Sequence, residues 1–219
     1  MCGRYTFRAP AADAARAFQV DPTPSLFPRY NIAPTQSVPI VRQAAAREMV
    51  LARWGLVPSW ASDLSIGYKL INARSETAAS KPSFRSAFKQ RRCLVVADGY
   101  YEWQKQGKHK QPYHIRMKDD GPFAFAGLWE RWQEPGGERV ESFTILTTEA
   151  NELMKPLHNR MPVILAPWDH DRWIDPKSRK VEDLQALLLP CPDEWLTATA
   201  VSTYVNSPRN EGPKCLEPA

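Results

Sequence analysis

Proline is the residue that most constrains the fold of this chain, because it occurs 20 times in 219 residues. This is about twice the usual share of roughly 5%. A proline cannot donate a backbone hydrogen bond, and it interrupts both helices and central strands. No apolar run approaches the ~20 residues that a membrane-spanning helix needs. We therefore expect short strands joined by sharp turns, in a chain that does not cross a membrane.

Strand-like runs dominate the chain and are separated mainly by hairpin-type turns. The predicted strand pairs are 36–42 with 48–54, 91–104 with 111–118, 122–132 with 139–148, and 162–166 with 197–205. Helical composition or spacing is found in 10–20, 82–90, 171–176 and 181–189. Hairpins make antiparallel sheets, so the sequence predicts an α+β fold with a mostly antiparallel, twisted, barrel-like sheet and a few peripheral helices. We expect a single domain over residues 1–219, with an extended C-terminal tail from about residue 206.

The cysteines and the charge narrow the function without identifying it. Cys2, Cys93, Cys191 and Cys215 form no CxxC pair and have no histidine at zinc-finger spacing, so we expect neither a metal, a cofactor nor a disulfide framework. The formal net charge of +5 is compatible with a nucleic-acid partner and is weak evidence alone. The N-terminus lacks the pattern of a signal peptide, which predicts a cytoplasmic protein that is nucleoid-associated when bound to DNA.

The chain begins Met1-Cys2-Gly3, and a small second residue allows removal of the initiator Met. Cys2 would then carry a free α-amine beside its thiol. An α-amine has an ordinary pKa of roughly 7.7–8.0, against about 10.4 for lysine, so part of it is neutral in the cell and can attack a carbonyl. The thiol can then add to the resulting imine and close a five-membered thiazolidine. The alternative is that Cys2 is an ordinary small residue at a frayed terminus.

Polar residues interrupt apolar surroundings in four segments, where a simple core strand would not place them. The segments are Cys2-Gly3-Arg4, 71–77 (INARSET), 97–103 (ADGYYEW) and 157–162 (LHNRMP). Six motifs, in this order and over essentially the whole chain, resemble the SOS-response-associated peptidase (SRAP) family of abasic-site processing proteins: MCGRYT, YNIAPTQ, WGLVPSW, INARSET, DGYYEWQ and HNRMPVIL. The resemblance implies that Cys2 forms a thiazolidine crosslink with the ring-opened aldehyde of an abasic site in single-stranded DNA, which shields the lesion.

The resemblance also implies roles for three further residues. Glu102 would be the general acid and base that moves protons between the amine and the departing water. His158 would help to open the deoxyribose ring, a task that suits imidazole, and Asn72 would position the amine or a sugar hydroxyl through its amide. The alternatives are a solvent-facing glutamate, a structural histidine and a turn-capping asparagine.

Six residues are candidates for contacting DNA. Arg4, Arg74 and Arg160 each lie two positions from a proposed reactive residue, and a guanidinium grips phosphate through two hydrogen bonds. Surface salt bridges, with Glu76 or Asp98 for example, are the alternative use of these arginines. Gly3 would allow close approach to a sugar, and Trp60 could stack on a base. Pro34 is a candidate wedge by resemblance alone.

The expected partners are single-stranded DNA with abasic sites and single-strand/double-strand junctions, bound by a monomer. The resemblance leaves lyase and autopeptidase activities open. A rival function is a cysteine peptidase with Cys2 as nucleophile, His158 as base and Asn72 as orienting residue, limited in one version to removal of Met1. A DNA-binding module without covalent chemistry is the third possibility; its binding would depend on salt and survive loss of Cys2.

Overall fold

The computed structural model describes every residue of the chain except Met1, Pro22 and Pro135. Its strands are β1 (Arg4–Phe7), β2 (Arg29–Ile32), β3 (Ser37–Gln43), β4 (Arg47–Trp54), β5 (Asn72–Arg74), β6 (Arg92–Ala97), β7 (Gly99–Gln106), β8 (His109–Met117), β9 (Phe123–Gln133), β10 (Arg139–Glu149), β11 (Arg160–Pro162), β12 (Ile164–Leu165) and β13 (Leu196–Ala200). Its α-helices are α1 (Ala11–Phe18), α2 (Ser75–Ala78), α3 (Arg85–Gln90), α4 (His170–Ile174) and α5 (Val181–Gln185). Short 3-10 helices are η1 (Leu64–Lys69), η2 (Pro167–Asp169), η3 (Asp193–Trp195), η4 (Thr203–Asn206) and η5 (Pro213–Leu216).

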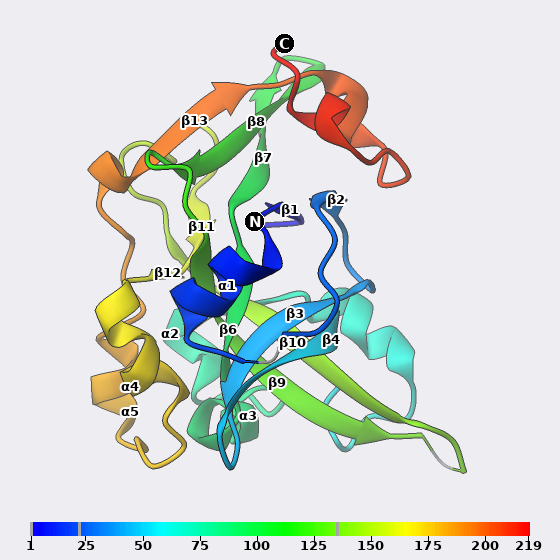
Figure 1. Ribbon diagram of the computed structural model, residues 1–219, viewed down its shortest axis with the longest axis vertical. Helices are drawn as coiled ribbons and strands as arrows, with labels where there is room; N and C mark the ends of the chain where they lie inside the picture. Colours follow the sequence, from blue (N-terminus) through cyan, green and yellow to red (C-terminus); the bar gives the residue numbers. More distant parts are fainter. Residues whose placement is uncertain (1, 22, 135) are drawn as a thin grey trace.

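A closed barrel forms the lower half of the molecule in Figure 1, from β3, β4, β10, β9 and β6 in that order around the ring. The neighbours are antiparallel except for β4 and β10, which run parallel. The strands curl around an aromatic interior, where Trp54 stacks on Phe143 with ring centroids 6.4 Å apart. The predicted hairpins β3–β4 and β9–β10 are confirmed, and so is the mostly antiparallel, barrel-like fold with peripheral helices.

A second, antiparallel sheet lies above the barrel, in the strand order β13-β8-β7-β1-β2. The short strand β1 lies between β7 and β2 in this sheet, near the centre of the molecule in Figure 1, where the second sheet meets the barrel. One continuous hydrophobic core includes side chains from both sheets, among them Tyr5, Ile40 and Ile115. The first residues of the chain are therefore placed at the junction of two layers.

The run 91–104 was expected to be one strand, and the structure divides it at Asp98 into β6 of the barrel and β7 of the second sheet. The reason is the Asp98 side chain, which accepts hydrogen bonds from the backbone nitrogens of Arg8 and Ala9 and from Thr6 Oγ1. A carboxylate with three such donors is stable in a buried bend. The single strand predicted from hydrophobicity is therefore wrong.

The predicted pairing of 162–166 with 197–205 is also wrong. The first segment contributes β12, which pairs with β9, whereas the second contributes β13, which pairs with β8. Both segments are strands, as the apolar pattern indicated. Their partners are set by the course of the chain through two sheets, which local composition does not encode.

The C-terminal segment differs from the expected extended tail, because it folds back on the second sheet through η4 and η5. Val205 and Cys215 are buried against Tyr101, and Val201 bridges to Pro218. The Asn31 side chain donates hydrogen bonds to two backbone carbonyls of this segment, those of Ser207 at 2.9 Å and Asn210 at 2.8 Å. Apolar side chains and a buried amide that satisfies these carbonyls hold the segment in place.

The helices cover the outside of the barrel. Helix α4 packs on β6, and Leu184 and Leu188 of the predicted apolar stripe on and after α5 are buried. The guanidinium of Arg92 at the start of β6 ties this layer together, since it donates to the carbonyls of Phe88, Lys89, Trp173, Asp175 and Ser178. None of the helices in the described part of the chain is long and apolar enough to span a membrane.

Candidate active site

Cys2 lies immediately before β1 and is fully buried in the core that the two sheets share. Its carbonyl oxygen accepts a hydrogen bond from Asn72 Nδ2 at 2.8 Å. Burial raises the pKa of the Cys2 thiol far above its ordinary value, and the negative charge of Glu102 raises it further. The resting thiol is therefore neutral. Asn72 thus contacts the backbone of Cys2, and the charge of Glu102 acts on its thiol.

Glu102 is supplied by β7, the strand that pairs with β1. Its side chain is 5% exposed, although a glutamate in a strand normally faces solvent. Its Oε1 accepts a hydrogen bond from the backbone nitrogen of Trp103 at 3.2 Å. Side chains alternate along a strand, so Tyr100 lies on the same face as Glu102, and Tyr101 and Trp103 lie on the other. The solvent-facing alternative for Glu102 is thus wrong.

Asn72 begins β5, a three-residue strand that pairs in parallel with β10. While its Nδ2 holds Cys2, its Oδ1 is buried, and in the part of the chain that the structure describes this oxygen has no hydrogen-bond partner. An amide oxygen is an acceptor of N–H and O–H groups. The side chain therefore fixes the backbone of Cys2 and keeps one acceptor free beside it.

His158 lies in the turn before β11 and is partly exposed. Its Nδ1 accepts a hydrogen bond from the backbone nitrogen of Arg160 at 3.0 Å. In the neutral ring the proton then resides on Nε2, which is the nitrogen left to exchange protons with a ligand.

Glu76 follows β5, pairs with Arg160 and is influenced by the charge of Arg74. Arg160 makes a two-point ion pair with Glu76, at 2.5 and 3.0 Å, and donates to the Thr147 carbonyl at 2.5 Å. The pKa of Glu76 is lowered, mainly by its hydrogen bonds to Arg160 and also by the charges of Arg160 and Arg74. The salt-bridge alternative is therefore realised for Arg160, whereas Arg74 is exposed at the end of β5.

Arg4 makes hydrogen bonds within the protein. Its guanidinium donates to Asn31 Oδ1 at 2.7 Å and to the carbonyls of Val205 and Asn206 at 3.0 and 3.1 Å, and it lies 5.8 Å from the Trp103 ring centre. The predicted two-residue spacing places Asn72 and Arg74 in one strand. It fails for Cys2 and His158, which lie before β1 and β11 rather than in them.

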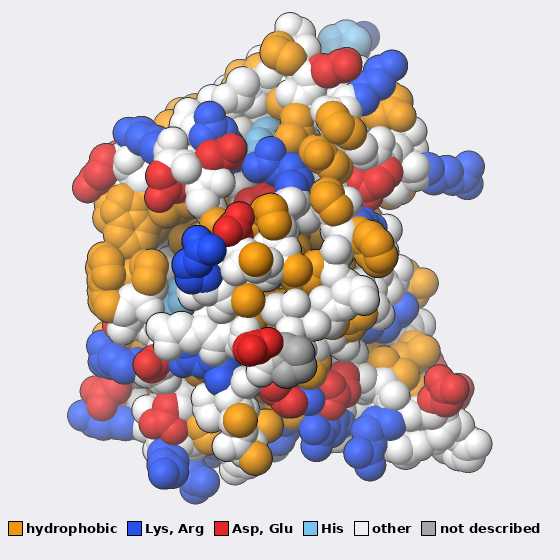
Figure 2. Space-filling model, viewed as in Figure 1, with side chains coloured by type: hydrophobic (Ala, Val, Ile, Leu, Met, Phe, Trp, Pro, Cys, Tyr) orange, Lys and Arg blue, Asp and Glu red, His pale blue; other side chains and the backbone are white. Residues whose placement is uncertain are grey.

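The other three predicted DNA contacts differ in exposure. Trp60 is 60% exposed in the loop after β4, and Pro34 is partly exposed in the turn between β2 and β3. Gly3 is partly exposed between Cys2 and Arg4. Trp60 makes none of the polar contacts described above. Lys and Arg are interspersed with Asp and Glu over the lower part of the face in Figure 2, so no single-sign patch marks a site there.

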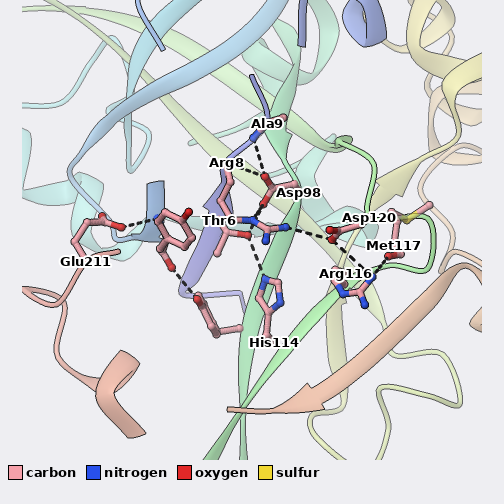
Figure 3. Close-up of polar contacts among 11 residues, drawn as sticks. Thr6, Arg8, Ala9, Asp98, His114, Arg116, Met117, Asp120 and Glu211 are labelled. Atoms are coloured by element: carbon pink, nitrogen blue, oxygen red, sulfur yellow. Dashed lines mark hydrogen bonds and ion pairs between the residues drawn. The ribbon is translucent and has the colours of Figure 1, made fainter. Parts of the chain in front are cut away.

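The position of β1 depends on a buried network on the face opposite Tyr5. Figure 3 shows Asp98 between Thr6, Arg8 and Ala9, with His114 of β8 directed at Thr6. Thr6 Oγ1 donates to Asp98 Oδ1 at 2.6 Å and lies 3.2 Å from His114 Nε2. Burial lowers the pKa of His114 to about 3, with Arg8 and Arg116 adding to the effect. The ring is therefore neutral and has a structural role.

The comparisons with known proteins decide the family. The model of the SOS response associated peptidase (SRAP) family matches residues 1–208. The chain belongs to this family. Among its SRAP relatives, abasic site processing protein YoqW of Bacillus subtilis is 42% identical over 222 residues, covering 99% of both chains. Abasic site processing protein HMCES of Xenopus tropicalis is 37% identical over 224 residues, covering 86% of this chain and 65% of that protein.

The fold agrees with solved structures of similar chains. A crystal structure of a protein from Bacteroides thetaiotaomicron superimposes with a TM-score of 0.86 at 28% identity, covering 100% of both chains. A protein from Bordetella bronchiseptica gives a TM-score of 0.81, also at 28% identity, over 92% of this chain.

Sequence reasoning did not single out Tyr100 of β7, which is fully buried and lies opposite Tyr5 of β1 in the strand register. Its sequence context is that of an ordinary core aromatic. The one available signal is that Tyr100 lies two positions before Glu102, which puts both on one strand face.

Proposed function

We propose that this protein captures abasic sites in single-stranded DNA covalently, through a Cys2 made N-terminal by removal of Met1, and so shields the lesion in the DNA damage response. Met1 lies outside the described residues, so its removal stands as part of the proposal. The relatives named abasic site processing proteins support the substrate class. The observation that carries the proposal is the placement of Cys2, gripped at its carbonyl by Asn72 and facing the charge of Glu102.

The reaction joins the Cys2 nitrogen to the aldehyde carbon of the ring-opened sugar. The amine attacks the carbonyl, Glu102 takes a proton from the nitrogen, and the carbonyl oxygen takes up a proton from water to give a carbinolamine. This hydroxyl leaves as water with the proton that Glu102 returns, so a protonated imine remains. The free Oδ1 of Asn72 accepts an N–H of the amine and orients its lone pair. His158 acts earlier, exchanging a proton through Nε2 with the ring oxygen as the closed sugar opens.

The thiol closes the ring in the last step. Its sulfur adds to the imine carbon, the C=N electron pair moves to nitrogen, and one thiazolidine forms without a further leaving group. Because burial keeps the Cys2 thiol protonated, the addition needs a base to take that proton. The Glu102 carboxylate, having given its proton to the departing water, is the group in position to accept it.

The DNA contacts remain proposals built on the sequence. Arg74 and Arg160 are candidates for holding the backbone on one side of the lesion, with Gly3 allowing the sugar to approach and Trp60 and Pro34 contacting bases. Arg4 holds β1 and the C-terminal segment together. Its contribution to DNA binding is therefore indirect, or it uses guanidinium N–H groups that make no hydrogen bond within the described part of the protein. Single-strand/double-strand junctions would suit a site whose basic side chains lie on one flank.

The peptidase alternative needs a thiolate activated by a neighbouring base. The raised pKa of the buried Cys2 thiol weighs against a resting thiolate, and His158 Nδ1 is engaged with the backbone of Arg160. A single intramolecular cleavage that releases Met1 is compatible with both functions. Turnover of an unrelated peptide that is lost in Cys2→Ala would favour the protease.

The test is a denaturing gel of the protein with a single-stranded oligonucleotide that carries one abasic site, after mass spectrometry has shown that the protein begins at Cys2. We expect a heat-stable shifted band with the lesion and no band with an undamaged oligonucleotide. Cys2→Ala, and a variant with an extra residue before Cys2, should both lose the band.

Cys2→Ser separates the two halves of the mechanism. It keeps the amine and lacks the ring-closing thiol, so it should form a transient Schiff base and cleave the strand by β-elimination. A Cys2→Ser crosslink as stable as that of the wild type would refute the thiazolidine. Absence of any band with correctly processed wild-type protein would refute covalent capture.

A further inference from the structure

Tyr5 and Tyr100 form a buried pair of phenols across β1 and β7. They are opposite each other in the strand register, and both rings pack edge-on against Phe125 with centroids 5.9 Å away. Both side chains are fully buried. Nevertheless, among the residues that the structure describes, neither hydroxyl has a hydrogen-bond partner.

Two unpartnered hydroxyls in one core require an explanation. Buried polar groups in proteins are nearly always hydrogen-bonded, because an unmade bond costs stability. Phenylalanine would fill the same space without that cost. The two hydroxyls therefore lower the stability of the resting protein. This is the expected state of groups that find a hydrogen-bond partner only in a complex.

The surroundings of the pair identify the complex. Cys2 lies in the same core cluster, and Asn72, which holds the Cys2 carbonyl, carries another unpartnered buried atom, the acceptor Oδ1. Tyr100 shares a strand face with Glu102, two positions away. Burial raises the pKa of Tyr100, and the charges of Cys191, Cys2 and Glu102 raise it further, in that order. Burial and then the charge of Cys2 raise the pKa of Tyr5, with no contribution from Glu102. Of the two phenols, Tyr100 is the one placed with the proposed acid and base.

We propose that Tyr100 is a further catalytic residue, whose hydroxyl donates a hydrogen bond to the aldehyde oxygen of the abasic sugar while the Cys2 amine attacks. This rests on the proposed function. As the N–C bond forms, the C=O electron pair moves to that oxygen, and a donor aimed at the growing charge lowers the barrier. The same oxygen then leaves as water with the proton from Glu102. Asn72 Oδ1 serves the amine, and Tyr100 serves the carbonyl.

The test compares Tyr100→Phe with wild-type protein and with Tyr5→Phe in single-turnover crosslinking to a saturating abasic oligonucleotide. Tyr5→Phe is a matched control, because it removes the same kind of unpartnered hydroxyl from the same core. We expect the rate to fall about tenfold or more in Tyr100→Phe, as for loss of an oxyanion donor, and to stay near wild type in Tyr5→Phe. An unchanged rate in Tyr100→Phe would overturn the assignment and leave the proposed function standing; a wild-type protein that never crosslinks would remove both.

Thermal unfolding of the same proteins distinguishes catalysis from structure. Loss of an unpartnered buried hydroxyl should leave the Tm of Tyr100→Phe equal to or above that of the wild type. Tyr101→Phe should lower the Tm, because the Tyr101 hydroxyl donates to the Tyr30 carbonyl at 2.7 Å. A Tyr100→Phe variant that is both less stable and slower would mean that the hydroxyl supports the fold, and would overturn the proposal.

A reductive trap shows which step Tyr100 serves. With Cys2→Ser as background, sodium borohydride reduces the Schiff base to a stable amine, so trapped product reports amine attack without the thiol. Adding Tyr100→Phe should slow trapping by the same factor as it slows the crosslink. Trapping at an unchanged speed would place Tyr100 after imine formation and contradict the role at the carbonyl.

Discussion

At the scale of single residues, burial gives the Cys2 thiol a protected resting state. A neutral thiol without solvent access reacts slowly with oxidants and alkylating reagents, since the thiolate is the reactive form. In the proposed mechanism, the imine would supply the electrophile at the moment when Glu102 can take the proton. The thiol would then stay unreactive until the substrate is attached to the neighbouring nitrogen.

Glu76 offers a test of the proposed arginine contacts. Glu76→Gln replaces the carboxylate that pairs with Arg160 by a neutral amide, and it removes the negative charge that interacts with Arg74. Both guanidiniums are then left to attract phosphate. We expect several-fold tighter binding of single-stranded DNA at low salt, measured by fluorescence anisotropy, with the gain decreasing as NaCl rises.

Asp183→Asn is the matched control, because Asp183 pairs with Lys180 in an exposed ion pair on α5. It should bind DNA as the wild type does. Equal affinities for Glu76→Gln and wild type across the salt series would argue that Arg74 and Arg160 do not bind the DNA backbone.

At the scale of elements, the alternation of side chains was predictable and the assignment of strands to sheets was not. Residues 36–54 and 122–148 pair as expected because each hairpin is local. The division at Asp98 depends on hydrogen-bond donors from residues 6–9, which lie 89 to 92 positions earlier in the sequence. The burial of Glu102 likewise follows from the barrel lying under β7, and only the family resemblance indicated it.

The buried network of Thr6, Asp98 and His114 predicts that the stability of the fold decreases in acid. His114, which touches Thr6 and lies near Asp98, Arg8 and Arg116, has its pKa lowered to about 3 by burial and by the two arginines. An unfolded histidine takes up its proton near pH 6.5. Between pH 6.5 and 3 the unfolded state therefore binds more protons, and stability falls as the pH falls, by up to about 1.4 kcal/mol per pH unit.

His114→Gln should flatten this part of the pH dependence of the free energy of unfolding, measured by urea denaturation from pH 7.5 to 4.5. His109→Gln, at the exposed start of the same strand β8, should keep the slope of the wild type. If both variants keep it, other groups cause the acid sensitivity. Gly99 must stay small beside this network, because a Cβ there would lie 2.1 Å from His114 Nε2.

At the scale of the whole molecule, Asn31 connects the two ends of the chain. Its Oδ1 accepts from Arg4, and its Nδ2 donates to Val205, Ser207 and Asn210 carbonyls. Asn31→Ala leaves these groups without their partner, so we expect a loss of about 1–3 kcal/mol in the free energy of unfolding and slower crosslinking at a temperature where the protein is folded.

Asn210→Ala is the comparison, since the Asn210 side chain donates a hydrogen bond to the Tyr204 carbonyl, within the C-terminal segment itself. It should lower stability less and leave the crosslinking rate unchanged. If Asn31→Ala retains the crosslinking rate while losing stability, the C-terminal segment supports the fold without positioning Cys2.

Much of the overall fold could be predicted from the sequence, because barrel strands have apolar, β-branched compositions and short turns. The chemistry of Cys2 was predicted from its place after the initiator Met, whereas the candidates Asn72, Glu102 and His158 were named through the family resemblance. The contact between Cys2 and Asn72 was not predictable. It requires β5 to lie beside β10 and β1 to lie beside β7, relations between segments far apart in sequence. The folded C-terminal segment was missed because its polar, proline-containing composition also suits an extended chain.

The contact of Arg4 with Val205 and Asn206 can form only late in protein synthesis. These partners are 201 and 202 positions from Arg4 in the chain, and a ribosome makes the N-terminal residue first. While the chain is growing, β1 has no C-terminal segment to hold it. The hydrogen bonds that join the two ends of the chain are therefore completed only when translation is almost finished.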